Sequence, residues 1–113
     1  MTASQKKKDL LQKLPAIVDA LKKGYHPEKI ILFGSLLDPD RESNDVDLFV
    51  VKKTKEDRLG RRAGQARQFL GDRTLPVDFL IYTPIEVSRE IERGNVFVRQ
   101  ILEEGKVLYE KTF

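Results

Sequence analysis

The chain has 113 residues and a formal net charge of +3, and 40% of its residues are hydrophobic and 35% charged. This length supports a modest core, so we expect a single domain over residues 1–113. The absence of cysteine excludes disulfides and thiolate metal sites, and the single histidine excludes a histidine-rich zinc site. The charge is too small for a dedicated nucleic-acid-binding protein, and no apolar run approaches the roughly 20 residues of a membrane helix. We therefore expect a cytoplasmic protein without a membrane or nucleic-acid partner.

The first predicted element is a helix from Ser4 to about Lys23. Its apolar residues recur every three to four positions, which is the period of one helix face. Ser4 is a candidate N-cap, and Pro15 either kinks the helix or begins a second one. Gly24 is expected to cap the C-terminal end, because glycine is favoured there.

A short apolar run, Lys29–Phe33, predicts a buried strand that ends at the turn formed by Gly34 and Ser35. Glycine allows backbone amides to approach a phosphate closely. A helix that starts at Ser35 would also direct its N-terminal amides toward an anion. This end of the strand therefore offers candidate phosphate-binding groups.

A second apolar run, Val46–Val51, predicts another buried strand, and two aspartates stand at its start. Asp45 and Asp47 are two positions apart, so their side chains project from the same strand face. Neighbouring carboxylates repel each other, and their desolvation is unfavourable. Mg²⁺ is usually held by one or two carboxylates plus substrate phosphates. A divalent-cation site therefore explains this pair better than an ordinary strand does.

A helix is predicted over Arg58–Leu70. Its inward side is expected to consist of Leu59, Ala63, Ala66 and Leu70. Its outward side is expected to be a basic face formed by Arg61, Arg62 and Arg67. We interpret this face as an ordinary solvent-exposed surface, with a nucleotide or partner contact as the less favoured alternative.

A third strand is predicted within Leu75–Tyr82, with Val77–Ile81 as its centre. Asp78 lies inside this apolar run and needs a partner, either an arginine or the edge that carries Asp45 and Asp47. The remaining elements are predicted as two helices and a short strand, over Pro84–Arg93 with Thr83 as N-cap, Val96–Glu104 and Val107–Tyr109. Together the elements predict an α+β fold (an α/β class in the broad sense), with a small mixed sheet and helices mainly on one face.

The sequence Gly34-Ser35, nine further residues, Asp45-x-Asp47 and then Asp78 on a later strand resembles the minimal nucleotidyltransferases of the DNA polymerase β superfamily. The resemblance covers most of the chain and implies a polymerase-β-like fold. It implies that Gly34 and Ser35 bind the β- and γ-phosphates of ATP or another nucleoside triphosphate. It also implies that Asp45 and Asp47 hold Mg²⁺ or Mn²⁺. Asp78 would act as general base on the attacking hydroxyl or as ligand of a second metal ion.

The same resemblance implies transfer of AMP from ATP to a hydroxyl group, with loss of pyrophosphate. Single-domain members are often encoded beside an all-helical HEPN-type protein, and characterised ones act as antitoxins by adding AMP to a tyrosine of that partner. We therefore expect an antitoxin with a HEPN-type partner. The alternatives are a catalytically weak module that neutralises a helical partner by binding alone, and a structural domain whose aspartates form salt bridges. The oligomeric state stays open.

One segment departs from the family pattern. Many members carry Ala-Arg-Gly or a close relative after Gly-Ser, whereas this chain has Leu36-Leu37-Asp38-Pro39. The missing arginine favours the binding-only alternative, while the three retained aspartates favour an enzyme. A phosphate contact from Arg41, further along this loop, is a less favoured hypothesis. Because the chain has no separate acceptor-binding module, we expect the acceptor to bind near Asp78. Repulsion among the three carboxylates is expected to raise at least one of their pKa values.

Overall fold

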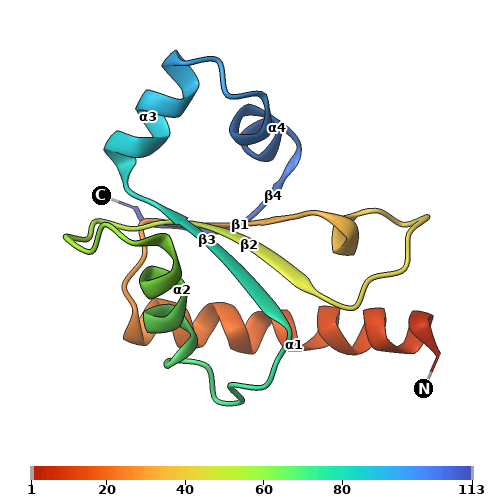
Figure 1. Ribbon diagram of the computed structural model, residues 1–113. Helices are drawn as coiled ribbons and strands as arrows, with labels where there is room; N and C mark the ends of the chain where they lie inside the picture. The colour runs from red at the N-terminus through yellow and green to blue at the C-terminus, as the bar shows by residue number, and fades with distance from the viewer. Residues whose placement is uncertain (1, 113) are drawn as a thin grey trace.

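The structure, a computed structural model, describes residues 2–112 and contains a four-stranded sheet with helices on both faces (Figure 1). The strands are β1 (Lys29–Phe33), β2 (Val46–Val51), β3 (Val77–Tyr82) and β4 (Lys106–Glu110). The helices are α1 (Ala3–Gly24), α2 (Leu59–Arg67), α3 (Pro84–Glu92) and α4 (Val96–Glu104), with a short 3-10 helix, η1, at Ser35–Leu37. Every strand predicted from the sequence is therefore confirmed. Within residues 2–112, no helix combines the length and the apolar character that crossing a bilayer requires.

The strands follow the order β3-β2-β1-β4. β1 pairs antiparallel with both β2 and β4, whereas β2 and β3 run parallel. The sheet is therefore mixed, as predicted. Parallel pairing requires a long crossover, and α2 supplies it between β2 and β3. The register of this pair places Asp47 directly opposite Asp78.

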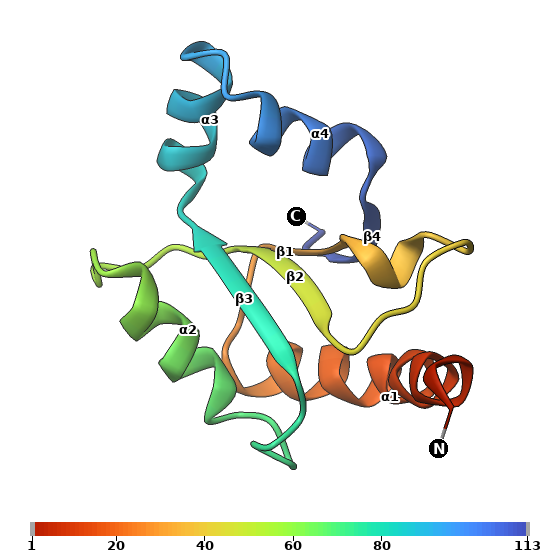
Figure 2. The same ribbon diagram turned by 45° about the vertical axis from the view of Figure 1, so that its right-hand side comes forward.

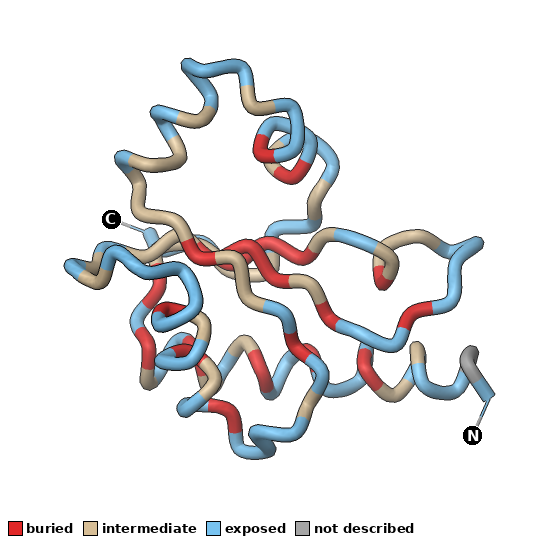
Figure 3. Tube along the Cα trace, viewed as in Figure 1, coloured by how far each residue is buried: buried red, intermediate tan, exposed pale blue. Residues whose placement is uncertain are grey.

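The four helices are divided between the two faces, but most of the buried core lies on the face covered by α1 and α2 (Figure 3). The α1 residues in this core recur at helical spacing and are Leu10, Leu14, Ile17 and Leu21. Their partners on the sheet alternate along the strands and include Ile30, Leu32, Leu48 and Val50. A smaller cluster, Ile31, Phe49, Val98 and Ile101, lies on the opposite face under α3 and α4 (Figure 2). The two faces therefore differ in how completely they are closed.

The ends of α1 differ from the prediction. The helix begins at Ala3 with Thr2 as N-cap, because the Thr2 and Gln5 side chains form a capping box with each other's backbone amides. Ser4 as N-cap is therefore wrong. Pro15 lies inside one continuous helix, and Gly24 is its last residue, with Tyr25 in the C-cap position.

The predicted exposed basic face of α2 is wrong at Arg62, whose side chain is only 3% exposed. Its guanidinium donates to the carbonyl oxygens of Glu56 at 2.6 Å and Ile81 at 3.0 Å. It also donates to Glu86 Oε1 at 2.7 Å, so a buried cation meets a carboxylate at the start of α3. Arg62 has the spacing of a surface residue on α2, but the crossover places it under the edge of the sheet.

Arg67 performs a similar role at the other end of α2. It donates to the carbonyl oxygens of Leu75, at 3.0 Å, and Val77, and its guanidinium lies 5.6 Å from the centre of the Phe79 ring. Leu75 lies just before β3, and the Val77 carbonyl belongs to β3, beside which residues 2–112 form no further strand on the outer side. Arg62, through Ile81, and Arg67, through Val77, therefore satisfy carbonyl oxygens of this edge strand. Arg61 alone of the three is exposed.

The boundaries and inward residues of α2 are only partly as predicted. The helix ends at Arg67, and Leu70 lies beyond it, although Ala66 and Leu70 are both buried in the larger core. Leu59 is 44% exposed, so its assignment to the inward side is wrong.

Candidate active site

The structure places the predicted aspartates on one face of the sheet. Asp47 in β2 lies opposite Phe33 in β1 and opposite Asp78 in β3. Directly opposed residues on neighbouring strands project from the same face. Phe33 belongs to the smaller cluster, so this is the face of α3 and α4. Asp45 lies immediately before β2, and its negative charge acts on Asp47.

Gly34 lies against Asp47, and only glycine fits there. Its φ is +82°, in the region that favours glycine, and a Cβ at this position would lie 2.3 Å from Asp47 Oδ2. The turn after β1 and the first residues of β2 are therefore in direct contact. This arrangement brings the predicted phosphate-binding turn next to the predicted metal ligands.

The helix expected from Ser35 is a single 3-10 turn. Its amides are partly used inside the turn, because Leu37 N–H donates to Gly34 O and Asp38 N–H donates to Ser35 O. A helix does begin at Ser35, as predicted, but it is too short to provide the predicted N-terminal anion site. The Leu-Leu-Asp-Pro segment explains this difference, because proline at position 39 disfavours helical backbone before it.

A pair of serines connects this turn to Asp45. Ser35 Oγ donates to Ser43 Oγ at 2.9 Å, and Ser43 Oγ donates to the carbonyl oxygen of Asp45 at 2.8 Å. Ser43 is 2% exposed, although it lies in a polar loop. Sequence reasoning missed Ser43, because its burial depends on the way the loop folds back. The pair fixes the position of Asp45 relative to the turn.

The pKa of Asp47 is raised above its ordinary value. Burial is the largest cause, followed by the negative charges of Asp78 and Asp45. The expected rise in at least one pKa is thus confirmed, with burial ahead of repulsion. A cation between these carboxylates would remove the repulsion, so their chemistry fits a divalent ion.

The carboxylates do not form a complete metal site by themselves. Asp45 and Asp78 are exposed, and Asp47 is half-buried. Among residues 2–112, no group of three or more acidic, histidine or cysteine side chains is arranged as a ready cation site. An ion held by Asp45 and Asp47 would therefore complete its shell with water and phosphate oxygens, which is the usual situation for Mg²⁺.

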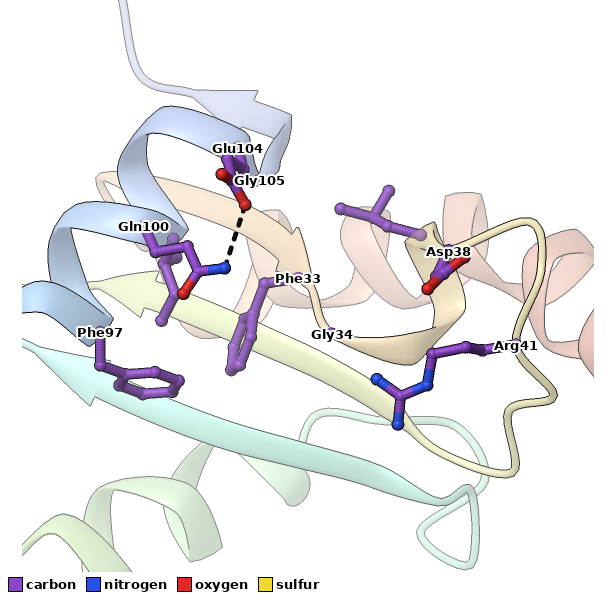
Figure 4. Close-up of a pocket in the computed structure, with 10 residues that line it drawn as sticks. Phe33, Gly34, Asp38, Arg41, Phe97, Gln100, Glu104 and Gly105 are labelled. Atoms are coloured by element: carbon purple, nitrogen blue, oxygen red, sulfur yellow. Dashed lines mark hydrogen bonds between the residues drawn. The ribbon is translucent and has the colours of Figure 1, made fainter.

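A cavity of about 350 Å³ opens beside Gly34 on the same side of the sheet as Phe33 (Figure 4). Of the predicted site residues, only Gly34 lines it, and the three aspartates do not. Its other walls come from β1, the loop after η1, and α4, and they include Phe33, Asp38, Arg41, Phe97, Gln100 and Glu104. Sequence reasoning missed this cavity, because its walls are more than half the chain apart.

The loop that forms one wall of this cavity is anchored by α1. Lys7 Nζ donates to the carbonyl oxygen of Asp38 and, at 2.9 Å, to that of Arg41. These bonds hold the loop from outside, so the Arg41 side chain extends from a fixed backbone toward Gly34 (Figure 4). The first turns of α1 thus help to shape the site.

Comparison with known proteins identifies the family. Residues 16–113 match the sequence profile of the family described as polymerase beta, nucleotidyltransferase. The chain belongs to this family. Nucleotidyltransferase domains of this kind generally use divalent metal ions and nucleoside triphosphates. The family resemblance seen in the Gly-Ser and Asp-x-Asp sequences is therefore confirmed at the level of the superfamily.

The fold of this nucleotidyltransferase domain also matches a crystal structure from Sulfolobus solfataricus of a protein provisionally described as a nucleotidyltransferase. The TM-score is 0.63 at 19% sequence identity, and the match covers 96% of this chain and 87% of that one. At this identity the likeness establishes the fold, which is polymerase-β-like. No curated protein matches the chain.

Proposed function

We propose that this domain is a Mg²⁺-dependent nucleotidyltransferase that transfers AMP from ATP to a hydroxyl group of a partner protein. The observation that carries the proposal is the contact between Gly34 and Asp47, with Asp78 directly opposite Asp47. The candidate groups then follow one another across the sheet: the phosphate-binding turn after β1, the metal-binding Asp47 on β2 and the candidate base Asp78 on β3. This order is the one that a triphosphate and an attacking hydroxyl require.

Asp45 and Asp47 would hold Mg²⁺, with Mn²⁺ as a substitute. The ion would supply charge neutralisation for the entering and leaving oxygens of an in-line displacement. The exposed amides of the Gly34-Ser35 turn would bind and orient the β- and γ-phosphates. Positioning of this kind accounts for much of the catalysis in phosphoryl and nucleotidyl transfer.

Asp78 would take the proton from the acceptor. The hydroxyl oxygen forms a bond to the α-phosphorus while the bond to the pyrophosphate oxygen breaks, and the hydroxyl proton passes to the Asp78 carboxylate. Asp78 is exposed on β3, so an acceptor can reach it from solvent. Its second proposed role, as ligand of another metal ion, uses the same orientation toward Asp47.

The proposed acceptor is a tyrosine hydroxyl of a HEPN-type helical protein, and the proposed biological role is that of an antitoxin. Two things support this proposal: the family resemblance, and the exposure of Asp78 at the outer strand of the sheet. A side chain of a second protein can enter there without displacing any element of the domain.

A binding-only module is the second candidate, and two observations favour it. The Ser35 hydroxyl already donates to Ser43, and the turn after it is a single 3-10 helix with no arginine. Both features weaken the phosphate site relative to the usual family pattern. In this case the domain would neutralise its helical partner through contact alone.

Incubation of the protein and its candidate HEPN-type partner with Mg²⁺ and ATP tests the two candidates. We expect mass spectrometry to show added AMP on the partner, and no addition with the Asp45→Asn/Asp47→Asn variant. Asp19→Asn is the matched control, because Asp19 forms an exposed pair with Lys23 on α1. Neutralisation by the double variant without added mass would establish the binding-only module instead.

A further inference from the structure

The cavity beside Gly34 has an aromatic wall that the proposed transfer of AMP does not yet use. Phe33 and Phe97 meet edge to face, with ring centroids 5.9 Å apart and an angle of 81° (Figure 4). Phe97 is 53% exposed, at a position on α4 where a polar side chain would ordinarily be expected. An exposed aromatic side chain at the mouth of a cavity is typical of a surface that binds a planar group.

The rest of the cavity lining is rich in hydrogen-bond acceptors. Gln100 Nε2 donates to Glu104 Oε2 at 3.1 Å, which leaves Gln100 Oε1 and the second Glu104 oxygen free to accept. Asp38 adds another carboxylate, and Arg41 is the cation that lines the cavity with it. Two carboxylates beside one guanidinium disfavour a phosphate here, whereas they suit a neutral group that carries N–H donors.

The position of the cavity connects it with the triphosphate site. Gly34 lines the cavity and also contacts Asp47, so the two sites share this residue. Two further cavities lie along α1, one toward Leu108 and the other toward Leu70, and both residues belong to the core on the opposite side of the sheet. A volume of about 350 Å³ lies within the range of about 300–1,000 Å³ that is usual for small-molecule sites.

We propose that this cavity binds the nucleobase of the nucleotide and favours a base with an exocyclic amino group, adenine above uracil. The base would lie against Phe97 and Phe33, and its amino group would donate to Gln100 Oε1 and Glu104. Uracil presents a carbonyl oxygen at the corresponding position, which would face these acceptors without a proton between them. The inference rests on the proposed function, because it assumes that the phosphates occupy the Gly34-Ser35 turn.

Calorimetric titration with ATP, UTP and inorganic tripolyphosphate, each with Mg²⁺, tests this assignment. We expect the wild type to bind ATP more tightly than UTP. Phe97→Ala should weaken ATP binding about tenfold, since the loss of one stacking partner has this order of effect. The same variant should leave tripolyphosphate binding unchanged, and Gln100→Leu should reduce the preference of ATP over UTP.

Val96→Ala is the matched control, because Val96 is 76% exposed on the same helix and does not line the cavity. If wild type, Phe97→Ala and Gln100→Leu bind ATP with the same affinity and still bind tripolyphosphate, the base site is overturned but the proposed function is not. Equal loss of ATP and tripolyphosphate in Phe97→Ala would also overturn it. Absence of binding of all three ligands to the wild type would instead overturn the proposed function.

Discussion

The two faces of the sheet are built for different tasks, and β2 contributes to both. Val46, Leu48 and Val50 point into the closed core under α1 and α2, and each is fully buried. Asp47 lies between them in the sequence and points to the other face, where a cavity remains open between η1 and α4. The closed face can therefore stabilise the domain, while the open face keeps the half-buried charge of Asp47 and an open cavity, which contribute less to stability.

Truncation of the closed face should have the largest effect on stability. Leu48 is completely buried at the centre of the sheet, so Leu48→Ala should lower the free energy of unfolding by about 2–5 kcal/mol. Phe97→Ala on the open face removes a larger side chain that is 53% exposed, and its loss should be below about 1 kcal/mol. Chemical denaturation measures both variants. Equal losses would show that the open face is packed as tightly as the closed one.

The Arg62–Glu86 pair joins the helices of the two faces, and its loss should have the next largest effect. Arg62→Met nearly keeps the volume but removes four hydrogen bonds and leaves Glu86 without its cation, so we expect a loss of about 3 kcal/mol. Arg61→Met is the matched control, because Arg61 is exposed, and it should change stability by less than about 0.5 kcal/mol. Identical denaturation midpoints for the two variants would contradict the bridging role.

The same pair predicts a smaller effect of pH. Burial alone would raise the pKa of Glu86, but hydrogen bonds from Arg62 and Thr83 outweigh it and hold the pKa below its ordinary value. A lowered folded-state pKa means that Glu86 stabilises the fold above its ordinary pKa, and that this stabilisation disappears as pH falls through the lowered value. Glu86→Gln should therefore reduce stability at neutral pH and flatten its acid dependence. If acid unfolding of this variant is the same as that of the wild type, Glu86 does not contribute to the pH dependence of stability.

On the open face, the removal of a charge should have a small effect of the opposite sign. The raised pKa of Asp47 means that ionisation in the folded state is unfavourable, so the fold loses stability as pH rises from the ordinary aspartate pKa toward the raised value. Asp47→Asn should therefore increase the melting temperature at neutral pH without metal. Scanning calorimetry tests this, with Asp19→Asn as an exposed control. A lower melting temperature for Asp47→Asn would contradict the unfavourable ionisation of Asp47 in the folded state.

The sequence predicted those features that depend on local patterns. Short β-branched runs predicted the strands, and Thr83 followed by Glu86 predicted the start of α3, which the capping box confirms. The convergence of Asp47 and Asp78 followed from strand periodicity combined with the family resemblance. Each of these signals lies within a few residues of the feature that it predicts.

The features that the sequence did not predict depend on distant partners. Arg62 has surface spacing on α2, and only the carbonyl of Ile81 and the carboxylate of Glu86 make its burial favourable. Phe97 belongs to an ordinary amphipathic pattern, and its place at the cavity depends on Phe33 more than sixty positions earlier. Thr2 and Ser4 offer similar capping hydroxyls, and the partner residue Gln5 decides between them.

In the proposed function, the open face holds a triphosphate through a cation on Asp45 and Asp47. The most direct measurement is the affinity for ATP with and without Mg²⁺, in wild type and in Asp47→Asn. We predict that the wild type binds ATP more tightly with Mg²⁺, and that Asp47→Asn abolishes this increase while it retains the fold. The same Mg²⁺-dependent increase in both proteins, or none in the wild type, would contradict the claim.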